Sequence, residues 1–160
     1  MGKIPLGQLF DFPSGMMFRN YKQICALKTA PLFEIACVLG IRAPKNEWLI
    51  NLGKQYGHNC GMAFQVYDDY CDLIQVVGQP WESASKGKLP SSPVALRHQL
   101  GSDGAVTEEN CTDVLVIGRR FLVAASSVTD SSHESVGKSH IKELPQFCCG
   151  SLIAEVAEQS

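Results

Sequence analysis

Four polar residues in the middle of the chain are spaced to share one face of a helix. Gln65, Asp68, Asp69 and Asp72 stand at positions i, i+3, i+4 and i+7, a spacing that stacks side chains on one helical face. Three carboxylates so placed repel one another, and a hard divalent cation would reverse the sign of that interaction. Because one or two carboxylates with water and phosphate oxygens suit magnesium, the spacing predicts a Mg²⁺ site on Asp68, Asp69 and Asp72.

The alternative for an isolated Asp-Asp-x-x-Asp run is a solvated acidic turn. Most of the residues around the acids are apolar, namely Met62, Ala63, Phe64, Val66, Tyr67, Tyr70, Leu73 and Ile74. This context favours a largely buried helix whose carboxylates face a cavity, where buried charge needs a partner.

A cation and a hydroxyl stand together where a second helix should break. The apolar spacing from Phe18 to Val38 predicts a helix, and Pro31 interrupts it because proline lacks a backbone donor and crowds the preceding turn. The break should fall at Lys28-Thr29, where freed backbone groups, the ammonium and the hydroxyl can meet an anion.

The acid-bearing helix should be long. Asn46 is a candidate N-cap, and helical spacing continues from about Glu47 to Val76. Gly53, Gly57 and Gly61 fall four apart on one face, which predicts the close approach of another backbone.

The rest of the chain predicts further helices and loops, and no strand. Residues 1–15 form a lead-in segment, 78–93 a flexible loop and 126–135 a serine-rich connector. Shorter helices are expected at about 94–99, 110–126 and 144–158. The fold class is all-α, with about five to six helices in a single partial domain spanning 1–160.

Composition narrows the functional classes. The 14 basic and 16 acidic residues give a net charge of −2 with no basic stripe, which argues against nucleic acid. No apolar run approaches the roughly 20 residues of a transmembrane helix, and the start lacks a signal-peptide core, so a cytoplasmic protein is expected. The seven cysteines are expected to be reduced, and the four scattered histidines do not suggest zinc.

Two motifs in order resemble the trans-isoprenyl diphosphate (polyprenyl) synthases. They are Tyr21-x-x-Ile24-x-x-x-Lys28-Thr29-Ala30-x-Leu32-Phe33 and Gly61-x-Ala63-Phe64-Gln65-Val66-x-Asp68-Asp69-x-x-Asp72-Leu73. Gly7-Gln8-Leu9, a Gly87-Lys88 loop and Leu144-Pro145 also look like family positions. The resemblance implies an isoprenoid-synthase-type helical bundle that joins an allylic diphosphate to isopentenyl diphosphate head to tail, with Mg²⁺.

By this resemblance, Asp68, Asp69 and Asp72 would hold Mg²⁺ that bridges to the diphosphate. Lys28 would contact the allylic diphosphate, and Lys88 would close over the phosphates.

The resemblance also gives roles to three residues nearer the reacting carbons. Thr29 and Gln65 would line those carbons and help to orient the base, and Phe64 would contribute to the substrate site beside Gln65.

The sequence departs from the family pattern in three places. The first Asp-Asp-x-x-Asp motif and its paired arginines have no counterpart, the loop after Gly78 lacks a lysine and an aspartate, and Pro31 replaces a small residue. Three hypotheses therefore stand. The chain is a prenyltransferase, or it is a non-catalytic or degenerate synthase subunit that binds a prenyl diphosphate or a full-length partner, or it is a helical domain whose acidic motif binds nothing. For the first two, a homo-oligomer or a complex with a complete synthase is expected.

Overall fold

The computed structural model describes residues 21–40, 46–81 and 93–130 of the chain. It has five helices in these ranges: α2 (Tyr21–Lys28), α3 (Ala30–Gly40), α4 (Glu47–Ile74), α6 (Pro93–Leu100) and α7 (Glu108–Asp130). No strand is present in the described part beyond one isolated bridge, so the predicted all-α class is confirmed. The lead-in 1–15 and the helix expected at 144–158 lie outside the described residues.

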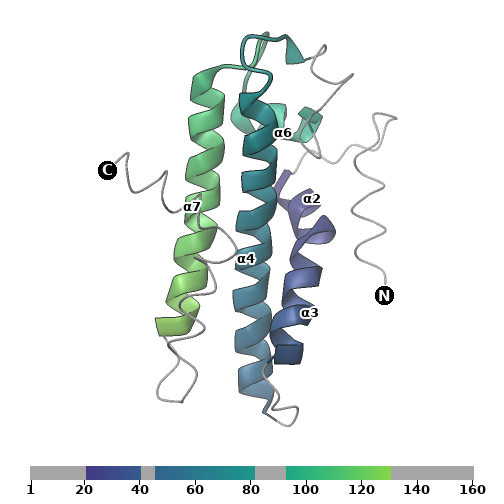
Figure 1. Cartoon of the computed structure of the whole chain (residues 1–160), viewed down its shortest axis with the longest axis vertical. Helices are drawn as coiled ribbons and strands as arrows, with labels where there is room; N and C mark the ends of the chain where they lie inside the picture. The colour runs from purple at the N-terminus through teal and green to yellow at the C-terminus, as the bar shows by residue number, and fades with distance from the viewer. Residues whose placement is uncertain (1–20, 41–45, 82–92, 131–160) are drawn as a thin grey trace.

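The helices form a partial bundle around α4. In Figure 1, α4 is the central rod, with α7 along one side and α2 and α3 along the other. The chain descends through α2 and α3, rises through α4 and descends again through α7, while the short α6 lies near the upper end. Buried apolar side chains of α2, α4, α6 and α7 form one core that extends to the polypeptide around Trp81 and Val106. This arrangement places α2 and α3 against the acid-bearing helix.

The predicted helix break is present at Thr29, between α2 and α3. The two helices are bent by 43°, and the Thr29 N–H still donates to the Cys25 carbonyl at 3.1 Å. Pro31 is buried in the first turn of α3, where its missing N–H leaves no helical hydrogen bond unmade. The break therefore falls where the sequence predicted it, next to Lys28.

Glycines of α4 allow α3 to approach closely, as predicted. A Cβ at Gly57 would lie 2.6 Å from the carbonyl oxygen of Phe33, and one at Gly61 would lie 2.7 Å from Cα of Ala30. Both distances are far below a normal carbon contact, so an alanine would collide with backbone. The glycine face sets the distance between α4 and the helix break.

Capping side chains fix where α4 and α7 begin. Asn46 caps α4 by accepting from the Leu49 N–H at 3.2 Å, which confirms the predicted N-cap. At α7, the Asn110 N–H donates to the Thr107 hydroxyl at 3.2 Å, and the Thr107 N–H donates to the Asn110 side chain at 3.0 Å. This reciprocal pair starts α7 at Glu108, two residues earlier than predicted.

The predicted end of α7 was wrong, because the serine-rich stretch continues the helix to Asp130. The Ser127 hydroxyl donates back to the Ala124 carbonyl at 2.9 Å, so the serine is satisfied within the helix. Ala125 is fully buried with Tyr56 and Cys60 of α4. Packing against α4 therefore outweighs the weak helix preference of the serines.

The start of the loop expected at 78–93 is anchored in the core. The Gly78 N–H donates to the Val106 carbonyl at 2.8 Å, and the Trp81 N–H donates to the Gly104 carbonyl at 3.0 Å. Pro80 and Ala105 form the isolated bridge, and the Trp81 ring is buried. The remaining loop residues, 82–92, lie outside the described part, and Pro93 begins α6.

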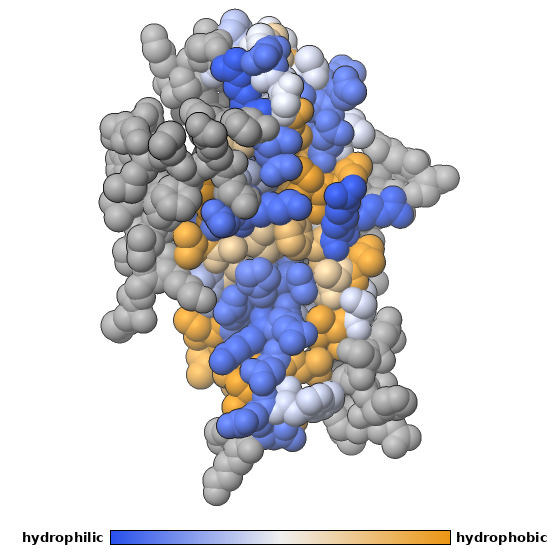
Figure 2. Space-filling view, turned by 180° about the vertical axis from the view of Figure 1, so that it is seen from behind, coloured by the Kyte–Doolittle hydropathy of each residue, from blue (hydrophilic) through white to orange (hydrophobic). Residues whose placement is uncertain are grey.

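The surface carries exposed hydrophobic side chains beside hydrophilic ones. Figure 2 shows a hydrophilic strip along one face with hydrophobic surface on both sides of it. The most exposed large apolar side chains include Leu32, Ile35 and Leu39 of α3 and Val123 of α7.

In the described ranges, no single helix combines the length and the hydrophobicity needed to cross a membrane.

Candidate functional site

A buried polar network joins α2, the helix break and α4. The Tyr21 hydroxyl of α2 donates to one carboxylate oxygen of Asp69 at 2.5 Å, and the Gln65 side-chain amide donates to the other at 3.2 Å. The Thr29 hydroxyl, at the break, donates to the side-chain oxygen of Gln65. All four side chains are buried, and Tyr21 and Asp69 have no exposed surface. The network brings together three of the predicted site residues, Thr29, Gln65 and Asp69.

The helical repeat explains how these residues meet. Gln65 and Asp69 are one turn apart on α4, so they point the same way, toward α2. Tyr21 and Cys25 are likewise one turn apart on α2 and are both buried. The break places Thr29 at the end of that helix, facing Gln65. A tight contact between Gly61 and Ala30 holds the two backbones close at this point.

Burial controls the protonation of the groups around Asp69. Burial raises the pKa of Tyr21 well above its usual value, and the negative charge of Asp69 raises it further. The Tyr21 hydroxyl therefore keeps its proton and remains a donor to the carboxylate. Burial also raises the pKa of the Cys25 thiol, and Asp69 adds to that rise. Neither side chain is a nucleophile at neutral pH.

The three aspartates occupy different environments. Asp68 is exposed, Asp72 is half-buried and Asp69 is fully buried, with both oxygens engaged. Asp68 and Asp72 are one turn apart and supply hard oxygen donors, which fits a Mg²⁺ ion held by one or two carboxylates together with water and phosphate. Over the described ranges, no group of three or more His, Cys, Asp or Glu side chains lies close enough to hold a metal. A ligand's own oxygens would have to complete the coordination shell.

Two further predicted residues, Lys28 and Phe64, directly precede Thr29 and Gln65 in the chain. Lys28 is the last residue of α2 and half-buried, and its ammonium is near enough to lower the pKa of Cys25. Phe64 is 41% exposed and packs against Phe33 of α3, with ring centroids 5.4 Å apart. Lys88 lies outside the described residues.

Tyr21 is the member of the network to which sequence reasoning assigned no role. It stood only at the head of a motif, and no spacing rule links it to Asp69, 48 residues later. One signal was available, because Tyr21, Cys25 and Lys28 share a face of α2 by helical spacing. That face had to meet whichever helix packed beside the break.

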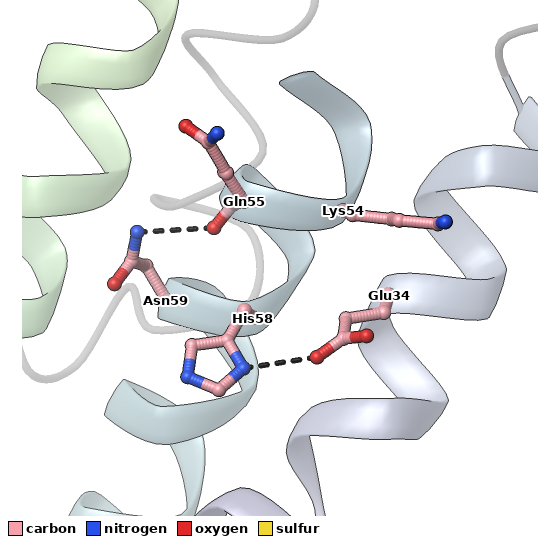
Figure 3. Close-up of a pocket in the computed structure, with 5 residues that line it drawn as sticks. All are labelled: Glu34, Lys54, Gln55, His58 and Asn59. Carbon is pink, nitrogen blue, oxygen red and sulfur yellow. Dashed lines mark hydrogen bonds and ion pairs between the residues drawn. The ribbon is translucent and has the colours of Figure 1, made fainter. Parts of the chain in front are cut away.

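A separate shallow depression lies between α3 and α4, nearer the start of α4. It has a volume of about 330 Å³ and is lined by Glu34, Lys54, Gln55, His58 and Asn59. Figure 3 shows His58 directed toward Glu34, with Nδ1 and the carboxylate 2.9 Å apart. None of the predicted site residues lines it. Its lining is polar and partly solvated, and His58 pairs with Glu34, so it is a polar surface groove.

Comparison with known proteins identifies one family. A family model described as polyprenyl synthetase matches residues 1–103, which is more than half of the chain and includes the whole buried network. Helix α7 lies beyond the matched region. No curated protein and no solved structure matches the chain.

Proposed function

The chain belongs to the polyprenyl synthetase family, and from that membership we propose that it joins an allylic diphosphate to isopentenyl diphosphate in isoprenoid biosynthesis. In this reaction the carbon–oxygen bond of the allylic diphosphate breaks and pyrophosphate leaves. A carbon–carbon bond forms to isopentenyl diphosphate, and a proton is lost from the new chain. The family supports prenyl transfer in general; the head-to-tail reaction and its metal are part of the proposal.

We assign the anionic end of the substrate to Lys28, Asp68 and Asp72. Mg²⁺, when bound through the two aspartates, would neutralise the charge that collects on the departing pyrophosphate. The Lys28 ammonium would add a positive charge beside the helix break. Lys88 is proposed to cover the phosphates. A cation placed where negative charge develops stabilises the transition state more than the ground state.

Thr29 and Gln65 are proposed to face the reacting carbons, with Phe64 supplying apolar contact to the prenyl chain. The single observation that carries this assignment is the hydrogen bond from Thr29 to Gln65. It ties the break next to Lys28 to the turn of α4 just before Asp68 and Asp69. Residues from both motifs therefore meet at one place, as a shared substrate site requires.

Product formation tests the proposal. The purified chain is incubated with a short allylic diphosphate, isopentenyl diphosphate and Mg²⁺, and prenyl products are separated by length. We expect longer products from the native chain and at least about tenfold less from Asp68→Asn, since a metal ligand is lost. Asp103→Asn is the matched control, because Asp103 is exposed and pairs with Arg97 far along the chain. Absence of product at every Mg²⁺ concentration would exclude catalysis by this chain.

The second candidate is a non-catalytic subunit that binds a prenyl diphosphate and associates with a second copy or with a complete synthase. Two observations favour it. The chain carries one Asp-Asp-x-x-Asp motif, and α3 exposes Leu32, Ile35 and Leu39. Mg²⁺-dependent binding of the diphosphate without product would support this candidate. If Asp68→Asn binds the diphosphate as well as the native chain and with the same dependence on Mg²⁺, the result would count against both candidate functions.

A further inference from the structure

The environment of Asp69 differs from that of the other two aspartates of the motif, Asp68 and Asp72. It has no exposed surface, and donors from two different helices occupy its two oxygens. Two hydrogen bonds from different helices hold this buried carboxyl group in one orientation. Its neighbours Asp68 and Asp72 retain exposed surface. The motif therefore contains one inward-facing anchor and two residues that can reach a ligand.

The anchor determines which way the Gln65 amide faces. A carboxylate only accepts hydrogen bonds, so Gln65 must turn its NH₂ group toward Asp69 and its oxygen toward Thr29. The Thr29 hydroxyl then donates its proton to the Gln65 oxygen, and the lone pairs of the Thr29 oxygen are left as acceptors. With the amide reversed, two acceptors would face each other in a buried space at a considerable cost. The orientation of both side chains follows from the hydrogen bond that Gln65 donates to Asp69.

We propose that Tyr21 is a positioning residue for the Thr29–Gln65 pair and acts through Asp69. Tyr21 supplies the second donor that holds the carboxylate, and Asp69 in turn fixes the Gln65 amide and the Thr29 proton. Asp69 is then a positioning residue of the network, while Asp68 and Asp72 are the residues that would hold Mg²⁺. The benefit to prenyl transfer rests on the proposed function, whereas the coupling itself is a property of the chain alone.

Side-chain amide signals in ¹⁵N nuclear magnetic resonance spectra of the full chain test the coupling without any ligand. In the native chain, the Gln65 NH₂ protons should exchange with water about 100-fold more slowly than those of exposed Gln55. In Tyr21→Phe and in Asp69→Asn, the Gln65 signals should shift, and their exchange should become about tenfold faster.

Tyr56→Phe is the matched control, because it removes a hydroxyl from another buried tyrosine of the same bundle. Position 56 is 13 residues from Asp69 on α4, which is roughly 20 Å along the helix axis. This variant should leave the Gln65 signals in place. If Tyr21→Phe leaves them unmoved, or if Tyr56→Phe moves them equally, the proposal is overturned. Rapid exchange of Gln65 in the native chain would overturn it even if a variant failed to fold.

A second experiment tests whether Asp69 anchors the network or binds the metal. Binding of inorganic pyrophosphate is measured at increasing Mg²⁺ concentration for the native chain, Asp68→Asn and Asp69→Asn. Asp68→Asn should raise the Mg²⁺ midpoint at least about tenfold, and Asp69→Asn should change it less than about twofold. An equal rise in both variants would make Asp69 a metal ligand and overturn its assignment as an anchor. Absence of pyrophosphate binding in the native chain would instead refute the proposed function, and the amide signals would still decide the coupling.

Discussion

At the scale of single residues, two consecutive aspartates of α4 differ in burial because consecutive side chains of a helix point about 100° apart. Asp68 and Asp69 are neighbours in sequence, yet the first is exposed and the second has no accessible surface. Burial of a carboxyl group is tolerated only where hydrogen-bond donors replace its water, and Tyr21 and Gln65 supply them. Sequence spacing placed the acids on one broad face. Only the packing partner shows which of them points inward.

Lys28 is predicted to bind pyrophosphate as the cation at the helix break. Lys28→Gln keeps most of the side chain but removes the charge, and should weaken Mg²⁺–pyrophosphate binding by about 10- to 100-fold, the usual range for a charged hydrogen bond. Titration calorimetry measures the change.

The control is Lys54→Gln, at an exposed lysine of the groove between α3 and α4. It makes the same chemical change on the same bundle, and affinity should stay within about twofold because exposed charges contribute little. Equal affinities for both variants and the native chain would exclude Lys28 as a phosphate ligand.

The cysteines should differ in reactivity according to burial. Burial raises the pKa of Cys25 and of Cys111, so little thiolate exists at pH 8 and little surface is open to a reagent. Both should react with iodoacetamide at least about tenfold more slowly than the partly exposed Cys37 and Cys71. Peptide mass spectrometry resolves each site. In denaturant all four rates should converge, and a difference that persists there would rule out burial as its cause.

At the scale of elements, the break at Thr29 and the glycines of α4 act together. Pro31 ends one helix and starts the next, and Gly61 lets the new helix begin against α4. Both features were predictable from sequence because they depend on local backbone chemistry. The N-cap at Asn46 belongs to the same class. Local rules therefore account for the scaffold of the site.

Gly61→Ala should destabilise the chain by about 1–3 kcal/mol, the usual cost of overpacking, although alanine gains up to about 1 kcal/mol in helix propensity. The added methyl would lie 2.7 Å from Cα of Ala30, which is backbone and cannot move aside alone. Urea unfolding measures the free energy. Gly40→Ala is the control, since nothing lies within 4 Å of a Cβ there. A stabilised Gly61→Ala would contradict the close approach.

The features that sequence reasoning missed depend on distant contacts. The Tyr21–Asp69 pair spans 48 residues, and the bridge between Pro80 and Ala105 joins two segments that flank α6. The end of α7 persists because Ala125 and Val128 pack in a cluster with Tyr56 and Cys60 of α4, although its serines suggested a connector. In each case tertiary packing overrides a local preference, and a single sequence carries no direct record of it.

At the scale of the whole molecule, the bundle covers α4 on two sides and leaves the outer face of α3 exposed. Leu32, Ile35 and Leu39 follow one another at helical spacing, with exposed fractions of 54%, 55% and 74%. They form a continuous apolar stripe. Val116 and Val123 of α7 are exposed as well, but Arg119 and Arg120 stand between them. Continuous apolar surface favours association, whereas isolated apolar residues do not.

The stripe is therefore predicted to drive self-association or binding to a complete synthase. Ile35→Lys combined with Leu39→Lys should abolish association, because two charges would have to be desolvated at the interface. Sedimentation velocity over a 100-fold range of concentration, with and without a complete synthase, measures it. Val116→Lys with Val123→Lys introduces the same charges on α7, where the arginines already interrupt the surface, and should leave association unchanged. A native chain that stays monomeric and binds no synthase would show that exposed apolar area at α3 is insufficient for an interface. If both double variants lose association equally, the added charge and not the loss of the stripe would be the cause, because Val116 and Val123 lie outside the stripe.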